Sequence, residues 1–318
     1  MAANSKAIKQ RIKSVKNTKK ITKAMEMVAA AKMRKAVEAT LSTRQYALLA
    51  RELMTKLSEF EESNTTLLSI RPVKKVLLVV VSSNRGLCGS FNTNMYKKAQ
   101  QFITHLPEYA RQVKKDGEVI EPEEQVEVDV LGIGKKSAVF AKKQNKSLIA
   151  VFEHLKESPH FQDVLPICKM VIDSFKEATY DKVFVAYTEY KSSVVQIPTL
   201  RQLLPISKIS IDAMLDMSGS KSTSEEISDE LSLDRMIFEP DAETILRTIL
   251  PRLLEVQLYQ TVLESSASEY SARMVAMKNA SDSAGDMIQQ LSLEYNKNRQ
   301  AAITREIAEI VGGAVALE

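Results

Sequence analysis

TVLESSASEYSARMVAMKNASDSAGDMIQQLSLEY, the stretch from residue 261 to residue 295, decides the fold of this chain. Within it, apolar and small residues recur at spacings that alternate four and three without a break: Leu263, Ala267, Tyr270, Met274, Met277, Ser281, Ala284, Ile288, Leu291 and Tyr295. This spacing is the seam of a coiled coil, because two positions of each heptad face a partner helix. We therefore expect a long helix that lies against a second one.

The other end of the chain also has the composition of a long helix. The first 71 residues contain neither glycine nor proline, and residues 252–318 contain no proline and only Gly285, Gly312 and Gly313. At about 1.5 Å per residue, helices of roughly 50 to 60 residues are on the order of 75 to 90 Å long, which is more than a compact domain needs. Such rods indicate mechanics or docking more than chemistry.

The middle of the chain predicts a mainly parallel, Rossmann-like sheet covered on both faces, because strands alternate with helices. We expect strands at Lys75–Val81, Val126–Ile133, Ser147–Phe152, Lys182–Tyr190 and Val194–Leu200, and helices at Asn92–Ile103, Lys135–Lys143 and Phe161–Ala178. Hydrophilic stretches at 107–125 and 216–234 are expected to be surface insertions. The predicted regions are an N-terminal coiled-coil helix at 1–60, a central α/β domain at 72–205, a serine- and acid-rich loop region at 206–240 and a C-terminal coiled-coil helix at 241–318.

The charge of the chain is unevenly distributed. The net charge is +4, but residues 1–35 hold 11 Lys and Arg against the single acid Glu26. Three interpretations remain open for this cationic helix: a solvated face, a surface that binds nucleic acid or anionic membrane, and a face apposed to an acidic protein. The absence of aromatic residues before Tyr46 disfavours single-strand nucleic-acid binding, and the run Ala29–Ala31 suits helix packing better than a membrane interface.

Motifs for catalysis or cofactor binding are incomplete. The string RGLCGS at 85–90 follows a predicted strand and opens a helix but lacks the P-loop spacing, and GIGK at 132–135 lacks the third glycine of a dinucleotide fingerprint. Both are interpreted as tight turns. The three histidines have no metal-ligand spacing, and Cys88 and Cys168 are expected to be free, buried thiols. The longest aliphatic run, residues 76–81, is too short to span a bilayer.

Four strings, in order along nearly the whole chain, resemble the gamma subunit of rotary F-type ATP synthases of bacterial type: ITKAMEMVAAAKMR at 21–34, SSNRGLCGSFN at 82–92, ARMVAMK at 272–278 and YNKNRQAAITREIAEIVG at 295–312. The resemblance implies that the terminal helices form an antiparallel coiled coil, the central shaft inside a hexamer of alpha and beta subunits. The α/β domain would then lie on a membrane ring. Proton flow would turn the ring and this subunit, and the shaft would couple that rotation to ATP synthesis or hydrolysis.

The same resemblance implies contact residues. Those expected against the catalytic beta subunits, at an acidic lever or at a loop, are Met25, Arg273, Arg299, Gln300 and Thr304. Those expected near the membrane ring are Met236 and Glu239, and those expected to fill a bearing at the top of the hexamer are Ile307, Ile310 and Val311. The alternative for the polar positions is an exposed coiled-coil surface without a partner.

The implied partners are the alpha and beta subunits, the epsilon subunit and the membrane c-ring, with no nucleic acid, cofactor, metal or catalytic site of its own. The implied location is peripheral, on the cytoplasmic face of a bacterial plasma (inner) membrane, which the absence of a presequence favours. Two alternatives remain: a coiled-coil nucleic-acid-binding protein and an enzyme built on the α/β domain. Pro251 is expected to kink the C-terminal helix or to remove one hydrogen bond. No cysteine pair lies in 216–234, so the dithiol regulation of chloroplast relatives is not expected.

Overall fold

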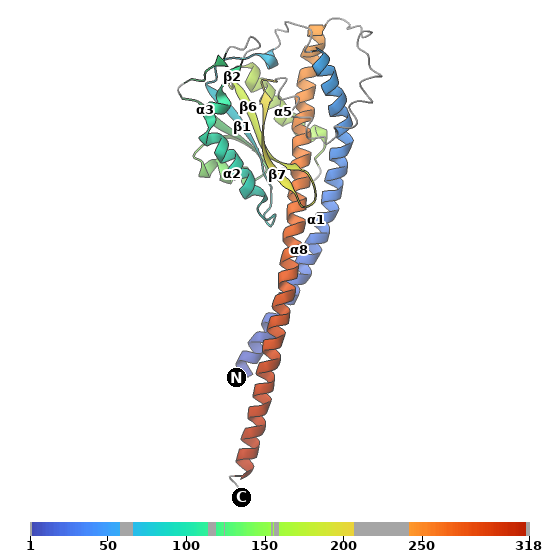
Figure 1. Ribbon diagram of the computed structural model, residues 1–318, viewed down its shortest axis with the longest axis vertical. Coiled ribbons are helices and arrows are strands. Elements are labelled where there is room, and N and C mark those ends of the chain that lie inside the picture. Colours follow the sequence, from blue (N-terminus) through green and yellow to red (C-terminus); the bar gives the residue numbers. More distant parts are fainter. Residues whose placement is uncertain are drawn as a thin grey trace. The chain divides into compact units, whose positions relative to one another are not determined.

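The computed structural model describes residues 2–57, 66–113, 119–123, 125–153, 155, 159–206 and 242–315. Its contacts divide the chain into two compact units: Met1–Ala31 with Arg273–Glu318, and Lys32–Ala272. Two long helices, α1 (Ala2–Leu57) and α8 (Ala242–Val315), contribute to both units (Figure 1). Each unit therefore contains one part of each helix.

The two long helices are continuous and antiparallel. Within the unit Lys32–Ala272, the Thr43 hydroxyl donates to Gln260 Oε1 at 2.8 Å, and Lys32 Nζ lies 5.7 Å from the centroid of the Tyr270 ring. Residue numbers thus fall along α1 as they rise along α8. The helix α8 continues through Pro251, so the proline does not end the helix. It removes one backbone hydrogen-bond donor. The predicted pair of long helices is confirmed.

A five-stranded sheet forms the centre of the unit Lys32–Ala272, in the order β5-β4-β1-β6-β7. Its strands are β1 (Lys75–Val81), β4 (Glu127–Ile133), β5 (Ser147–Phe152), β6 (Lys182–Tyr190) and β7 (Gln196–Leu204). The first four are parallel to one another, and β7 is antiparallel to β6. The helices between them are α2 (Phe91–Thr104), α4 (Lys136–Lys143) and α5 (Phe161–Lys176). The predicted α/β domain is confirmed.

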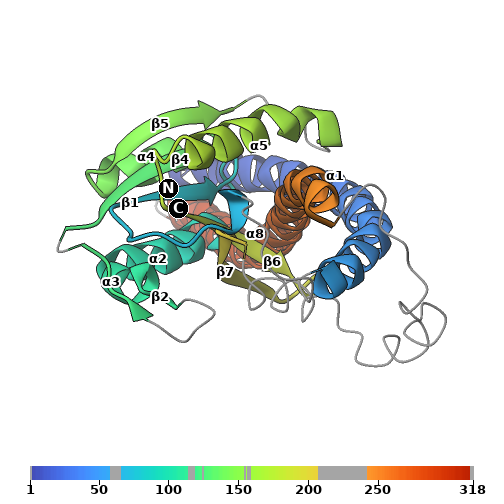
Figure 2. The ribbon, with the colours of Figure 1, turned by 90° about the horizontal axis from the view of Figure 1, so that it is seen from above.

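Both faces of the sheet are buried, which explains the uninterrupted aliphatic sequence of β1. Leu77 and Val79 point into one core with residues of α5 and α8, and Leu78 and Val80 point into a second core with residues of α2 and α4. Four α8 residues one turn apart enter the first core: Leu250, Leu254, Leu258 and Val262. Figure 2 shows α5 and α8 on one side of the sheet and α2 on the other. The start of α8 is therefore a structural layer of the α/β unit.

Several short elements differ from the sequence-based expectations. A helical turn η1 (Thr66–Leu68), a short helix α3 (Leu106–Ala110) and a hairpin of β2 (Gln112–Val113) with β3 (Val119–Ile120) were not predicted. The strands β2 and β3, and α3 from its second residue, lie in the stretch 107–125, which was expected to be only a surface insertion. The strand β7 begins at Gln196 rather than Val194, because residues 191–195 form the turn of the hairpin. In the described part of the chain, no helix is long and apolar enough to cross a membrane.

Candidate functional site

The seam on α8 is the main feature of the unit that joins Met1–Ala31 to Arg273–Glu318. The predicted seam residues of this part are buried or half-buried: Met274, Met277, Ser281, Ala284, Ile288, Leu291 and Tyr295. The residues between them, such as Lys278, Asp282 and Asp286, are exposed. The alternation of four and three therefore marks one buried stripe on an otherwise solvated helix, as the sequence predicted.

The matching row on α1 contains polar as well as apolar members. Ile8, Thr22 and Ala29 are buried on it. Lys19 falls on the same heptad row, and a Cβ built on Gly285 of α8 would lie 2.8 Å from Lys19 Nζ. The missing side chain of Gly285 thus leaves room for a charged seam residue that would otherwise have to turn away.

Met25 lies at the edge of this helix pair. Its side chain is half-buried, and the neighbouring Glu26 carboxylate pairs with Lys23 at 3.0 Å. Large apolar side chains nearby on α1 are exposed: Ile21, Met27 and Val28. This part of α1 is therefore cationic and has exposed apolar side chains around Met25, a combination suited to contact with another protein.

The remaining predicted contact residues differ in exposure. Arg273 is only 9% exposed and has an interaction partner within the chain, so little of its surface could meet another protein. Arg299, Gln300 and Thr304 are all exposed, and the Thr304 hydroxyl donates to the carbonyl oxygen of Gln300 at 3.0 Å. Met236 and Glu239 lie outside the residues that the structure describes.

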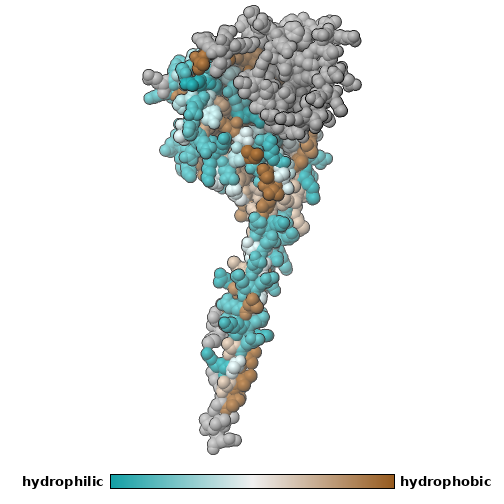
Figure 3. All heavy atoms as spheres, in the orientation of Figure 1, coloured by the Kyte–Doolittle hydropathy of each residue, from teal (hydrophilic) through white to brown (hydrophobic). Residues whose placement is uncertain are grey.

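The last turns of α8 carry an exposed apolar stripe. Its members follow one helix face at intervals of four, three and one residues: Ile303, Ile307, Ile310 and Val311. Figure 3 shows apolar residues gathered along the C-terminal part of the rod. Isolated exposed apolar residues are ordinary, but a continuous stripe of β-branched side chains on a helix indicates a surface that binds another protein.

The glycine-rich loop between β1 and α2 is bonded to itself. Asn92 Oδ1 accepts from the Ser83 backbone N–H at 3.1 Å, and Asn92 Nδ2 donates to the Ser83 hydroxyl at 2.7 Å. Gly89 has a positive φ of 56°, and Leu87 has the same left-handed conformation, at 64°. Gly134, in the second motif, has a φ of 87°, and a Cβ there would meet the Ser82 carbonyl oxygen at 2.1 Å. Both motifs are therefore tight turns in this structure.

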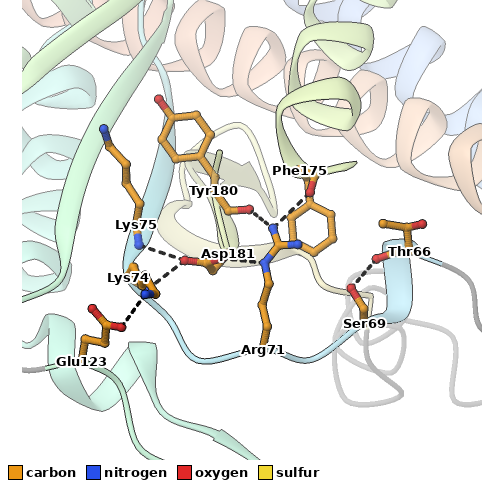
Figure 4. A network of polar contacts seen from close by, with 9 residues as sticks. All are labelled: Thr66, Ser69, Arg71, Lys74, Lys75, Glu123, Phe175, Tyr180 and Asp181. Atoms are coloured by element: carbon orange, nitrogen blue, oxygen red, sulfur yellow. Dashed lines mark hydrogen bonds and ion pairs between the residues drawn. The ribbon is translucent and has the colours of Figure 1, made fainter. Parts of the chain in front are cut away.

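A network of charged groups joins the segments that precede β1 and β6 (Figure 4). The Asp181 carboxylate accepts from the backbone N–H groups of Lys74 and Lys75, at 2.8 and 3.1 Å, and pairs with the Arg71 guanidinium. Arg71 also donates to the Phe175 carbonyl oxygen at 3.0 Å and lies over the Phe175 ring. These bonds align the starts of two parallel strands, so their role is structural. The sequence carried no local signal for them, because Arg71 and Asp181 are 110 positions apart.

Two buried ionisable groups were also missed by the sequence reasoning. Burial lowers the pKa of Lys182 to about 8, although its ammonium donates to the carbonyls of Tyr109 and Arg111 at 2.8 and 2.9 Å. Burial raises the pKa of Glu264 on α8 to about 7. Glu264 lies on a row of polar residues with four-and-three spacing next to the apolar seam, but such a row on a helix normally indicates a solvated face, so the sequence carried no signal for its burial.

The described residues contain no group of three His, Cys, Asp or Glu side chains that could hold a metal ion. Both cysteines are buried and free, as expected. The features suited to contact with other molecules are therefore the cationic part of α1 around Met25 and the exposed end of α8 from Arg299 onward.

The chain is similar in sequence to proteins of a known family. A family model described as ATP synthase matches residues 4–317. Curated relatives named ATP synthase gamma chain include those of Dehalococcoides mccartyi strain CBDB1, 37% identical over 99% of both chains, and Roseiflexus castenholzii, 41% identical over 99% of this chain and 98% of the other. The gamma chain of Nitrosococcus oceani is 40% identical over 99% of this chain and its own full length.

Solved structures show the same fold at lower identity. A chain from the Euglena gracilis mitochondrial ATP synthase, described as OSCP/F1/c-ring in rotational state 3, has a TM-score of 0.63 at 19% identity, with 100% of this chain and 95% of the other covered. A chain from the central stalk and c-ring of the Tetrahymena thermophila mitochondrial enzyme has a TM-score of 0.53 at 23% identity, with 82% and 99% covered.

Proposed function

Because this chain belongs to the family of ATP synthase gamma chains, we propose that it is the central rotor shaft of a proton-translocating ATP synthase. In this role it couples rotation of a membrane ring to ATP synthesis or hydrolysis in a hexamer of alpha and beta subunits. The chain is a mechanical, non-catalytic subunit, and the chemistry belongs to its partners. The nucleic-acid alternative and the enzyme alternative gain no support from these relatives.

The observation that carries the proposal is the division of α8 into two kinds of surface. The seam residues of α8 are buried or half-buried. Arg299, Gln300 and the apolar stripe at the end of the helix are exposed and could bind another protein. A shaft needs a stiff helix pair and an exposed surface that partners can engage and release. A helix with few glycines and a continuous seam meets the first need, and the exposed end meets the second.

The proposed partners are the alpha and beta subunits, the epsilon subunit and the c-ring, and the proposed location is peripheral, on the cytoplasmic face of a bacterial inner membrane. Within this proposal, Met25, Arg273, Arg299, Gln300 and Thr304 contact the beta subunits. The exposure of Arg299, Gln300 and Thr304, and the exposed apolar side chains around the half-buried Met25, support that assignment. Arg273 is only 9% exposed, so it would contribute little surface to the contact. Met236 and Glu239 are proposed to contact the ring, and the stripe Ile307, Ile310 and Val311 to fill a bearing in the hexamer.

Co-expression with alpha and beta subunits tests the proposal. We expect one copy of this chain in a complex with three copies of each partner, and cooperative ATP turnover that requires the chain. A complex of alpha and beta subunits that forms and turns over ATP identically without it would overturn the proposal. A salt titration of nucleic-acid binding tests the alternative, since a binder would show a steep decrease of affinity with salt.

A further inference from the structure

A second row of residues on α8 is polar and yet buried. Its members lie within the unit Lys32–Ala272 and follow the four-and-three spacing: Gln257, Thr261, Glu264, Ser268 and Ser271. Each is less than 9% exposed, and Ser268 and Ser271 are completely covered. Polar side chains at such positions lose their contacts with water, so their partners within the protein decide whether the packing is stable.

The face of the β6–β7 hairpin toward α8 carries both apolar and polar side chains. Tyr187 belongs to the same core as the α8 leucines, and cross-strand neighbours place Arg201 opposite Val185 and Thr199 opposite Tyr187 on that face. The tip of the hairpin is tied to α8 by the Ser271 hydroxyl, which donates to the Ser193 carbonyl oxygen at 2.5 Å. The hairpin therefore packs against the leucines of α8 along its base and meets the polar row of α8 near its tip.

Glu264 is the ionisable member of this row, and it is incompletely bonded. It is 5% exposed, and one carboxyl oxygen accepts from Gln260 Nε2 at 3.3 Å. The other oxygen, Oε2, has no hydrogen bond of ordinary geometry among the described residues, and neither has the neighbouring Ser268 hydroxyl; the Tyr187 hydroxyl approaches the carboxyl as a further, weaker donor. The Thr43 hydroxyl of α1 donates to Gln260 Oε1, so it is linked to Glu264 through the Gln260 side chain. An ionised carboxylate in this position would hold a buried negative charge with an unfilled oxygen.

Charged groups around Glu264 come mainly from the hairpin and partly cancel. Arg201 of β7 and Lys191 of the hairpin turn favour the ionised form, and Glu189 of β6 opposes it. Lys191 is already paired with Glu189 at 2.7 Å, which weakens its effect on Glu264. The Tyr187 hydroxyl also faces this carboxyl, and burial together with Glu264 raises the pKa of Tyr187. The cations near Glu264 therefore do not compensate for the loss of water.

We propose that Glu264 is a proton-binding site that fastens the tip of the β6–β7 hairpin, residues 187–199, to α8, with a neutral carboxyl when the tip is closed and a weakened contact once the proton is lost; this tip extends beyond the pairing of β6 with β1. Burial of the charged form is unfavourable, and opening the hairpin restores its hydration. The pKa of about 7 in the closed form, against 4.5 for an ordinary Glu, agrees with this geometry. A raised carboxyl pKa means that the closed form is favoured at low pH and is progressively weakened as the pH rises from about 4.5 through about 7.

The proton site does not depend on the rotor function, but its consequence for torque rests on that proposed function. In a rotor, torque between the sheet and the shaft would cross the contact between the hairpin and α8, because α8 continues as the shaft. Protonation of Glu264 would then set the stability of the contact between the hairpin and α8. A near-neutral proton site in this position would make that contact respond to the pH of the surrounding compartment.

Amide hydrogen exchange of the full-length chain tests the proposal. Protection of the amides at the hairpin tip, residues 187–199, is measured at about pH 6 and about pH 8 and corrected for the intrinsic pH dependence of exchange. With the two pKa values above, the opening equilibrium should increase about tenfold between these pH values in the wild type. Glu264→Gln mimics the neutral carboxyl and should give equal, high protection at both. Glu294→Gln, which changes an exposed acid on the same helix, should retain the tenfold difference.

Two results would overturn the proposal: a wild-type hairpin whose corrected protection does not change with pH, or a Glu264→Gln chain that keeps the tenfold change. Infrared spectroscopy supplies a measurement that does not depend on how the variant folds. The wild type at about pH 6 should show the carbonyl band of a protonated carboxyl that fades by about pH 8. A folded wild-type chain without this band would refute the proton site even if the variant were unfolded.

Discussion

The helix α8 has two parts with different surroundings, although its backbone is continuous. Between Leu250 and Ser271, within the α/β unit, apolar and polar residues are buried on several sides of the helix. From Lys278 to Ala308, within the other unit, the seam residues are buried or half-buried and most of the other side chains are exposed. The same secondary structure therefore serves as a core element in one unit and as a rod with one packed stripe in the other.

This difference indicates that tertiary neighbours, and not helix propensity, determine how well each position tolerates substitution. Leucine occurs in both parts, fully buried at Leu258 and 72% exposed at Leu293. Glutamate occurs in both as well, buried at Glu264 and exposed at Glu294. Pairs of equal residues on one helix thus allow experiments in which the side chain is constant and the surroundings change.

The largest effect is expected for leucine truncation. Leu258→Ala should cost about 2 to 5 kcal/mol of the free energy of unfolding, because it leaves a cavity between α8 and the sheet. Leu293→Ala should change stability by less than about 0.5 kcal/mol. Urea unfolding of the isolated chain, followed by circular dichroism, measures both. Equal costs would show that the two parts of α8 are packed alike.

The pH dependence of stability distinguishes the two glutamates. Since the pKa of Glu264 is raised from 4.5 to about 7, the folded state binds the proton more tightly than the unfolded state. The associated stability is fully present below about pH 4.5 and is lost as the pH rises to about 7. Its size is roughly 3 kcal/mol, at about 1.4 kcal/mol per pKa unit. Glu264→Gln should abolish this loss, and the difference between wild type and variant across this pH range isolates it from other groups. The comparison fails if Glu294→Gln has the same effect.

The exposed end of α8 should matter for partners rather than for folding. Replacing Arg299 and Gln300 together by Ala should leave the circular dichroism and the unfolding of the isolated chain unchanged, because both side chains are exposed. In the assembled complex, the loss of a charge-assisted contact of about 1.5 to 3 kcal/mol should reduce ATP turnover by roughly ten- to a hundredfold before assembly is lost. An unfolded double variant would instead assign these residues a structural role.

The smallest changes are expected at Met25. Met25→Leu keeps volume and apolarity, so its cost should stay below about 1.5 kcal/mol and coupling should be unchanged. Met25→Lys adds a charge to a moving contact with an acidic partner, which should tighten one rotary position and hinder departure from it. Proton pumping per ATP hydrolysed, measured in membrane vesicles with each variant, should fall only for Lys. Equal ratios in all three proteins would leave Met25 as an ordinary packing residue.

Sequence reasoning recovered the elements whose signal is local. The strands Lys75–Val81, Ser147–Phe152 and Lys182–Tyr190 were predicted with the observed bounds, and the α8 seam from Leu263 to Tyr295 is buried or half-buried, as its spacing requires. The reason is that both signals are local: a strand buried on both faces is a short, continuous run of mostly β-branched and apolar residues, and helix periodicity records which side of a helix faces a partner. The contact residues near the chain ends came from resemblance, and the structure adds that Arg299 and Gln300 are exposed while Arg273 is buried.

The sequence by itself determined that two long helices flank an α/β domain, since glycine and proline distribution and heptad spacing are properties of neighbouring residues. Only the tertiary structure decided which polar groups are buried. Arg71 meets Asp181, Lys182 meets the end of α3, and Glu264 meets the hairpin across large sequence separations. A carboxylate in a helical sequence normally indicates a solvated face, and it becomes a buried proton site only when another element covers it. That cover comes from sheet topology, because β7 turns back beside β6 and brings the hairpin against α8.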